Sequence, residues 1–108
     1  MEKFIYNGKK ELIFDGEYLN DLKNGKGKSF NINGNLLFDG VYLNSVRNGK
    51  GKEYYYGELI FKGEYLNGKR WNGEGKEYDE NEKLIFEGEY LNGEKNGKGK
   101  EYYNNGNL

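Results

Sequence analysis

Apolar and polar residues alternate in short runs along the chain, and each run ends in a cluster of Asn, Asp and Gly. In residues 12–19, Phe14 and Tyr18 fall on one face of an extended strand with the glycine between them, and acidic residues fall on the other. The central glycine disfavours a helix, and the i, i+3, i+4 spacing of an amphipathic helix is absent. The pattern predicts one strand over 12–19, a turn over 20–25 and a second strand over about 25–30.

Two short phrases recur along the whole chain. The phrase Asn-Gly-x-Gly-Lys begins at four asparagines spaced 24 residues apart: Asn24, Asn48, Asn72 and Asn96. Aromatic-x-Gly-x-Tyr begins at four phenylalanines: Phe14, Phe38, Phe61 and Phe86. A period of this length is typical of repeat arrays in which each unit is one supersecondary element. The sequence therefore predicts an all-β fold, an elongated single-layer antiparallel sheet of successive β-hairpins.

The repeats divide the chain into one continuous domain of four units, preceded by the end of a half repeat in residues 1–13. The units span 14–37, 38–60, 61–85 and 86–108. The third unit has one extra residue between its phenylalanine and its asparagine, and the segment before it is one residue shorter. Both changes are expected in turns. With two strands per unit at a spacing of about 4.8 Å, the array should be somewhat over 40 Å long.

Charges suggest a register for each hairpin. If Asp15 lies opposite Lys26, the ring before Asp15 lies over the glycine after Lys26, as in aromatic rescue of glycine. Three units keep this acid and this lysine, and the third unit inverts both signs, with Lys62 and Glu74. Opposite charges in all four units predict cross-strand pairs that contribute roughly 0.2–1 kcal/mol each.

Composition narrows the chemistry. Hydrophobic residues make up 34% of the chain and aromatic residues 17%, which indicates a thin core rich in rings. The net charge of −1 gives no long-range field to attract nucleic acid. Cys and His are absent, which removes disulfides, thiolate and imidazole catalysis and the usual zinc ligands. We expect no catalytic residue, metal, cofactor or small-molecule substrate, and a cytoplasmic protein, with association with a membrane or the cytoskeleton as a further expectation.

The repeated phrases also match a known family. Residues 86–99 read aromatic-x-Gly-x-Tyr followed by Asn-Gly-x-x-x-Gly-x-Gly, which closely resembles the MORN (membrane occupation and recognition nexus) repeat. The resemblance covers about residues 13–108, with Asp21 and Ser45 where the later units have a turn glycine. It implies a twisted sheet with an aromatic groove and a non-enzymatic scaffold that binds a protein partner, a second copy of itself or phospholipid.

The aromatic face is the first candidate for partner binding. Its residues, with a tryptophan expected in the lengthened turn of the third unit, are Phe14, Tyr18, Phe38, Tyr42, Phe61, Tyr65, Trp71, Phe86 and Tyr90. A single sheet has no second layer to cover these rings, so they form a thin core, a partner groove, or both. The open sheet ends, residues 6–14 and 101–108, are expected to bind a partner or to self-associate.

The Gly-Lys-Gly-Lys segments give an alternative surface. They are not a phosphate-binding P-loop, because no helix follows them. Stacked hairpins would align their lysines into a ladder: Lys26, Lys28, Lys50, Lys52, Lys76, Lys98 and Lys100. Such a ladder could meet lipid headgroups, at up to about 1 kcal/mol per lysine, or form a solvated, salt-bridged face. The functional alternatives are thus an interaction scaffold, a peripheral phospholipid-binding module, or an accessory domain of a larger polypeptide.

Overall fold

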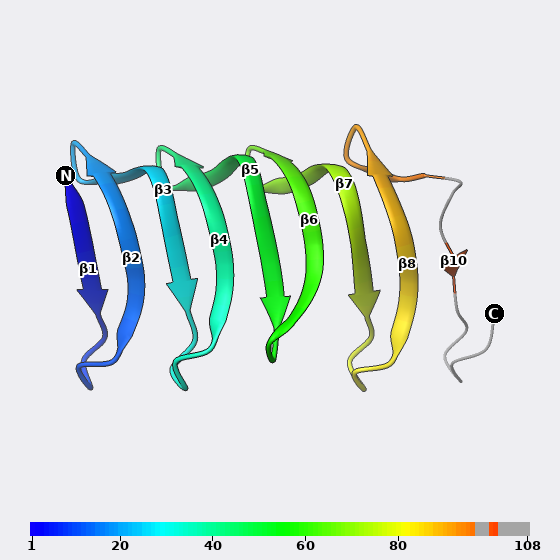
Figure 1. Ribbon diagram of the computed structural model, residues 1–108, viewed down its shortest axis with the longest axis horizontal. Coiled ribbons are helices and arrows are strands. Elements are labelled where there is room, and N and C mark those ends of the chain that lie inside the picture. Colours follow the sequence, from blue (N-terminus) through cyan, green and yellow to red (C-terminus); the bar gives the residue numbers. More distant parts are fainter. Residues whose placement is uncertain (97–99, 102–108) are drawn as a thin grey trace.

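The computed structural model describes residues 1–96 and 100–101, and it is one open antiparallel sheet (Figure 1). The strands are β1 (Glu2–Tyr6), β2 (Leu12–Leu19), β3 (Leu22–Phe30), β4 (Leu36–Leu43), β5 (Val46–Tyr55), β6 (Glu58–Leu66), β7 (Lys69–Tyr78), β8 (Leu84–Leu91), β9 (Glu94–Lys95) and β10 (Lys100–Glu101). Each strand from β1 to β8 pairs with the next one in the chain, and both β9 and β10 pair with β8. The predicted fold class is confirmed.

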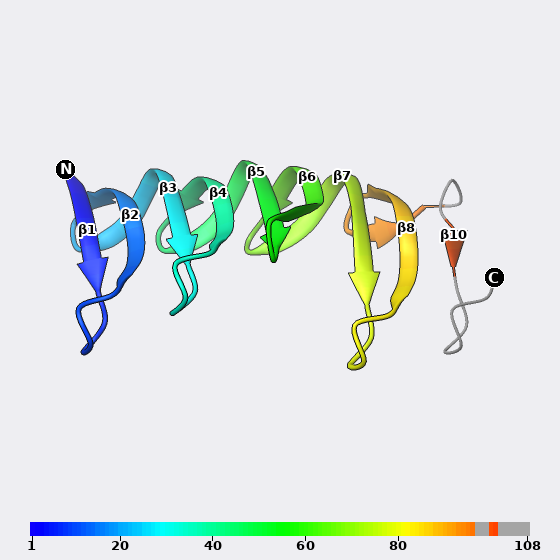
Figure 2. The ribbon, with the colours of Figure 1, turned by 60° about the horizontal axis from the view of Figure 1, so that its bottom comes forward.

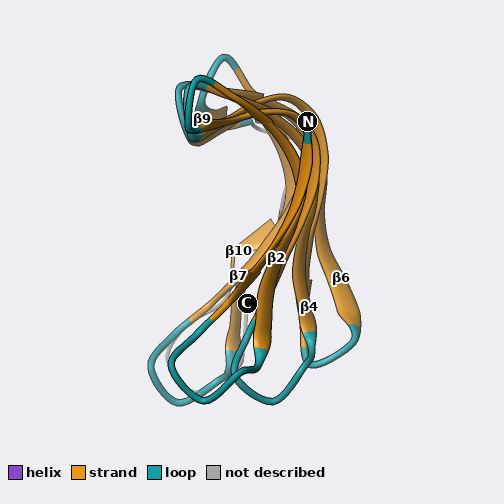
Figure 3. Ribbon diagram, turned by 90° about the vertical axis from the view of Figure 1, so that its left-hand side faces the viewer, coloured by secondary structure: helices purple, strands orange, loops and turns teal. Residues whose placement is uncertain are grey.

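The hairpins stack along one long axis. Figure 2 shows this succession from a second direction. The molecule measures 46 × 30 × 16 Å, which agrees with the predicted length of somewhat over 40 Å. Seen end-on, the strands superpose and curve together, so the sheet bends along its strands and is not flat (Figure 3).

The two strands of each unit are joined by a two-residue turn. Both turn residues have positive φ, for example 51° at Asn20 and 64° at Asp21, as a type I′ turn requires. The equivalent pairs are Asn44–Ser45, Asn67–Gly68 and Asn92–Gly93. The predicted turn over 20–25 is therefore too long, because β3 begins at Leu22.

The second, third and fourth type I′ turns also donate hydrogen bonds to the nearest strand of the preceding unit. The backbone N–H of Gly68 donates to the carbonyl of Arg47 at 2.8 Å, and the N–H of Asn67 donates to Oδ1 of Asn48 at 3.0 Å. In the next unit, Asn92 N–H donates to Oδ1 of Asn72 at 3.0 Å. The repeated asparagine thus joins neighbouring units at these two junctions.

A different turn joins one unit to the next. Asn31 Oδ1 accepts hydrogen bonds from the N–H groups of Asn33 and Asn35 at 2.9 and 3.0 Å, an Asx-type turn that recurs at residues 7–11 and 79–83. Between β5 and β6 a two-residue turn replaces it, with φ of 48° at Tyr56 and 82° at Gly57. This shorter turn explains the residue missing before the third unit.

The predicted register is wrong in three of the four hairpins. Asp15 pairs with Lys28 and not with Lys26, and the same shift of two residues gives the pairs Asp39–Lys52 and Glu87–Lys100. Opposite charges still face one another, but through the second lysine of each phrase. Only the third hairpin has the predicted pair, Lys62 opposite Glu74.

A bulge causes the shift. Tyr18 pairs with Lys23 and Gly16 pairs with Gly27, so β3 uses two more residues than β2 over this stretch. Gly25, within the extra segment, has a φ of 104°, which suits glycine. Periodicity alone does not reveal extra residues inside a strand. The register of the hairpin therefore could not be predicted by matching opposite charges.

Trp71 occupies the corresponding bulge of the third hairpin. Tyr65 pairs with Arg70 and Glu64 pairs with Asn72, which leaves Trp71 unpaired between them. The prediction that Trp71 lies in a lengthened turn is wrong, because the turn itself has two residues and the tryptophan lies within β7. A bulge of one residue in place of two moves the ladder and restores the Lys62–Glu74 pair.

Eight rings form the core in one continuous edge-to-face series. Ring centroids lie 5.1–5.7 Å apart in the order Tyr18, Phe14, Tyr42, Phe38, Tyr65, Phe61, Tyr90 and Phe86. The glycines lie beneath them, since a Cβ on Gly27 would come within 2.6 Å of the Phe14 ring. The expected covering of glycine by rings is confirmed, although Phe14 reaches Gly27 diagonally from its own partner Ser29.

Candidate functional site

One basic side chain per unit lies over the ring core, and each is the cross-strand partner of a tyrosine beside the type I′ turn. The guanidinium carbon of Arg47 is 4.2 Å from the Phe38 ring centroid and 5.9 Å from that of Tyr65, the tyrosine of the next unit. The series is Lys23, Arg47, Arg70 and Lys95. These cations cover the rings and form the outer surface of this face.

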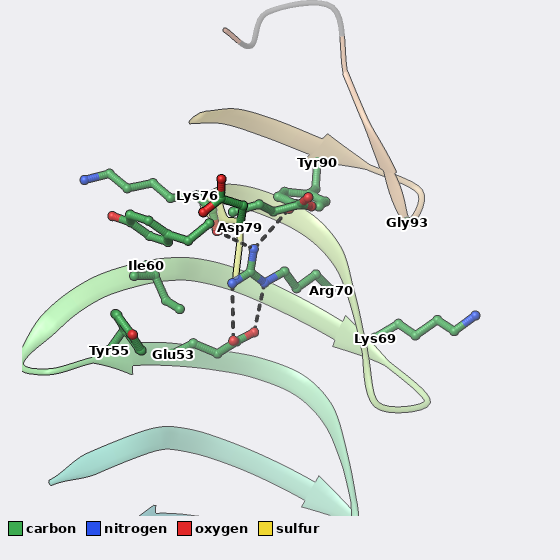
Figure 4. Close-up of a pocket in the computed structure, with 11 residues that line it drawn as sticks. Glu53, Tyr55, Ile60, Lys69, Arg70, Lys76, Asp79, Tyr90 and Gly93 are labelled. Carbon is green, nitrogen blue, oxygen red and sulfur yellow. Dashed lines mark hydrogen bonds and ion pairs between the residues drawn. The ribbon is translucent and has the colours of Figure 1, made fainter. Parts of the chain in front are cut away.

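Glu53 joins two of these cations. Its Oε1 accepts from Arg70 Nε at 2.9 Å and from the Tyr65 hydroxyl at 2.5 Å, and its Oε2 accepts from Arg70 Nη2 at 3.2 Å. Arg47 Nη1 lies 3.9 Å from the same carboxylate. Figure 4 shows Arg70 between Glu53 and Tyr90, whose hydroxyl is 3.0 Å from Arg70 Nη1. The Arg70 side chain therefore ties three strands together.

Burial and pairing oppose each other at these groups. Burial alone would raise the pKa of Glu53, but hydrogen bonds from Arg70 and Tyr65 and the charge of the arginines hold that pKa below its ordinary value. Burial and then the bond to Glu53 raise the pKa of the Tyr65 phenol. At the next junction, burial and then the bond to Glu77 raise the pKa of Tyr90 to about 12. The carboxylates are ionised and the phenols neutral over the physiological range.

The position that Glu53 occupies recurs every 24 residues, opposite the leading phenylalanine of the following unit, but it holds an acid only in the last two cases. The series is Ile5, Ser29, Glu53 and Glu77. Glu77 accepts from the Tyr90 hydroxyl and pairs with Lys95 Nζ at 3.1 Å, as Glu53 does with its own partners. The sequence patterns did not predict a role for these cations or these acids. Their spacing in each unit was the signal, but only cross-strand pairing shows that they meet.

An open hollow of about 650 Å³ lies beside Arg70, lined among others by Tyr55, Ile60 and Tyr78 (Figure 4). Two of its cations are already paired, Arg70 with Glu53 and Lys76 with Glu58 at 3.1 Å. The Tyr78 hydroxyl also donates to Glu58, at 2.9 Å. The hollow therefore has room for a ligand, but the charges of Arg70 and Lys76 are already neutralised by their partners.

The predicted aromatic groove is filled by its own rings. Seven of them are only 0–7% exposed and Tyr18 is half-buried. A partner on this face would meet the cations and carboxylates above the rings, because the rings themselves are covered. Trp71 is half-buried and packs under the next unit's turn, where a Cβ on Gly93 would be 2.9 Å from its ring.

The predicted lysine ladder is interleaved with acids. Lys28 pairs with Asp15 on one side and Asp39 on the other, and Lys52 pairs with Asp39 and Lys62. Lys26, Lys28, Lys50, Lys52 and Lys100 are exposed, Lys76 is half-buried, and Lys98 lies outside the described residues. The lysines line up as expected, but the stripe they form is of mixed charge.

An exposed row of aliphatic side chains runs along the array beside the type I′ turns. One leucine per unit, 40–59% exposed, precedes the turn: Leu19, Leu43, Leu66 and Leu91. Leu22 and Val46 extend the row as cross-strand partners of Leu19 and Leu43. Alternation along each strand places the four leucines on the face opposite to the rings. This aliphatic row was not singled out from the sequence.

Two further features are absent from residues 1–96 and 100–101. No three acidic side chains there converge in a way that could hold a metal ion. The same part of the chain contains no helix with the length and apolar character needed to cross a membrane.

Comparison with known families agrees with this geometry. A model of the MORN repeat matches residues 14–35, 38–57 and 86–108, more than half of the chain. The chain belongs to the MORN-repeat family. The third unit, which carries the Trp71 bulge, is outside the matched segments. MORN repeats are generally non-enzymatic and are consistent with interaction or scaffold modules. No curated protein matches the chain significantly.

Proposed function

We propose that this MORN array is a non-enzymatic interaction module that binds an amphipathic helix of a partner protein along the aliphatic row. The observation that carries the proposal is the recurrence of one exposed leucine at the same position of every unit. Exposed apolar side chains that repeat along one rim are typical of an interaction surface, whereas single ones are common on any protein.

The spacing of the row suits a helix. Two strands per unit advance by about 10 Å, and seven residues of an α-helix rise by about 10.5 Å. A helix lying along the array can therefore set one apolar residue against each leucine in turn. Several weak contacts would then add up, as is usual on repeat surfaces.

A helical peptide with leucine at every seventh position and polar residues elsewhere is the probe. Binding followed by fluorescence anisotropy should weaken by about tenfold or more in the double variant Leu43→Gln, Leu66→Gln, because two apolar contacts are lost. Ile32→Gln changes an equally apolar, 65% exposed side chain in a turn outside the row and is the matched control. Equal binding by the double variant would contradict the proposal.

The alternative function is peripheral binding of phospholipid by the exposed lysines. Sedimentation with anionic vesicles at several salt concentrations separates the two, because only the lipid mode depends steeply on salt. Vesicle binding lost in Lys28→Gln, Lys52→Gln, together with unchanged peptide binding by Leu43→Gln, Leu66→Gln, would favour the lipid alternative. Self-association through the sheet ends is a further proposal. A role as an accessory domain of a larger polypeptide is another.

A further inference from the structure

The junction between the first and second units lacks the acid found at the later junctions. Position 29 is serine, whereas positions 53 and 77, one and two periods later, are glutamate. Ser29 is the cross-strand partner of Phe38, just as Glu53 is the partner of Phe61. The backbone frame is therefore the same, and only the carboxylate is missing.

The groups that would hold that carboxylate are present. Lys23 Nζ lies 5.4 Å from the Tyr42 ring centroid, and Arg47 is the cross-strand partner of Tyr42. Burial and then the charge of Arg47 lower the pKa of Lys23, as expected for a half-buried cation with a second cation nearby. Arg47 is still accessible, since 31% of its side chain is exposed.

Among the described residues, these groups lack the hydrogen-bond and ion-pair partners that the equivalent groups have at the later junctions. Within the part of the chain that the structure describes, Lys23 forms no ion pair and the Tyr42 hydroxyl has no hydrogen-bond partner. Ser29 Oγ is buried and also has no partner among these residues. Arg47 reaches an acid only at 3.9 Å, on Glu53 of the next junction. Lys23, Arg47 and Tyr42 thus take the places that Arg47, Arg70 and Tyr65 have around Glu53, and Ser29 leaves the place of the carboxylate without an anion.

We propose that this junction is a binding site for a carboxylate supplied from outside the array, held by Lys23, Arg47 and the hydroxyl of Tyr42 above the short side chain of Ser29. The later junctions show the chemistry, because Glu53 accepts there from a tyrosine hydroxyl and two guanidinium nitrogens. A carboxylate fits such donors through its two oxygens. The source is either an acidic side chain of a partner or a small free carboxylic acid. The site lies on the ring face and does not depend on the aliphatic row.

The test uses the whole chain and two probes, N-acetyl-glutamate amide and a hexaglutamate peptide. Binding is followed by the NMR shifts of the Arg47 Nε–H and Ser29 amide signals at constant ionic strength. Saturable binding is expected for at least one probe, and it should weaken about tenfold or more in Ser29→Glu, whose own carboxylate fills the position. Stronger binding of the peptide would assign the site to a partner's acidic segment, and equal binding of both would assign it to a free acid.

Controls separate the site from general attraction to cations. Lys23→Gln should weaken binding, whereas Lys26→Gln, which removes an equal charge from an exposed position, should not. Glu77→Ser should create a second site beside Lys95 and raise the stoichiometry from one to two. Absence of binding by the parent chain, full binding by Ser29→Glu, or equal losses in Lys23→Gln and Lys26→Gln would each overturn the proposal. Phosphate that binds more tightly than either carboxylate would overturn it as well.

Discussion

The guanidinium of Arg70 holds the carboxylate of Glu53 at both oxygens, with nitrogen–oxygen distances of 2.9 and 3.2 Å. Glu53 lies on β5 and Arg70 on β7, two strands that are not paired with each other, so the contact passes over β6. Neighbouring units of this single-layer sheet are otherwise joined by the backbone ladder, by the rings and by a few polar contacts of turn and strand side chains. This pair therefore couples the second and third units through side chains.

Arg70→Met should destabilise the protein by about 2 kcal/mol, because Glu53 would keep its charge in a half-buried place without its main partner. Glu53→Gln should cost less, and the double variant should cost less than the sum of the two, since the pair is lost only once. Urea unfolding of all four proteins measures this coupling. Lys69→Met, at an exposed neighbouring position, is the control, and strictly additive losses would show that the two residues do not interact.

Stability should fall in acid partly through Glu53 and Glu77. Their pKa values are lowered in the folded protein, although burial alone would raise them, because Arg70, Lys95 and the tyrosine hydroxyls bind the ionised form. A carboxylate with a lowered folded pKa stabilises the protein above its ordinary value of 4.5 and loses that contribution as the pH falls through the folded value.

Glu53→Gln should therefore be less stable than the parent at pH 7 but lose less stability between pH 5 and pH 3, an interval set around the ordinary value of 4.5. The free energy of unfolding, measured across this range, checks the prediction. Glu80→Gln, in an exposed turn, controls for the loss of one negative charge. A parallel pH profile for parent and Glu53→Gln would contradict the assigned role of Arg70 and Tyr65.

Gly40→Ala should cost about 2–3 kcal/mol through overpacking. A Cβ there would stand 2.6 Å from Gly51 Cα and 2.6 Å from the Phe38 ring, and backbone cannot move aside as a flexible side chain can. Gly8→Ala is the matched control, because no atom lies within 4 Å of its Cβ position. The free energy of unfolding, measured by thermal denaturation, should fall by this amount for Gly40→Ala and by about 0.5 kcal/mol or less for Gly8→Ala. Equal shifts would mean that the glycine pairs do not set the ring packing.

Asn72→Ala should cost about 1 kcal/mol, since the N–H of Asn92 would lose its acceptor at the junction of the third and fourth units. Asn24→Ala should have a smaller effect, because the Asn24 side chain makes no hydrogen bond within residues 1–96 and 100–101. Chemical denaturation compares these two members of one repeated phrase. A larger loss for Asn24→Ala would show that the junctions are not held as described.

The repeat, the hairpin in each unit and the face on which the rings lie could all be predicted from residues that are close together in the sequence. Tight spacing of Asn and Gly restricts the backbone to turns, and alternation by two fixes the face of Phe14 and Tyr18 without reference to the rest of the chain. Local rules were sufficient because these features depend on neighbouring residues. They also gave the length of the array, which depends only on strand number and spacing.

The register of the hairpins and the contacts at the site depend instead on how the strands pack against one another. Asp15 meets Lys28 and not Lys26 because extra residues are absorbed in a bulge, and several bulge sizes satisfy the same alternation of faces. Arg70 meets Glu53 because strands two apart bring their side chains together above the rings. Such contacts depend on stacking between units, and a pattern that is read along one strand does not contain that information.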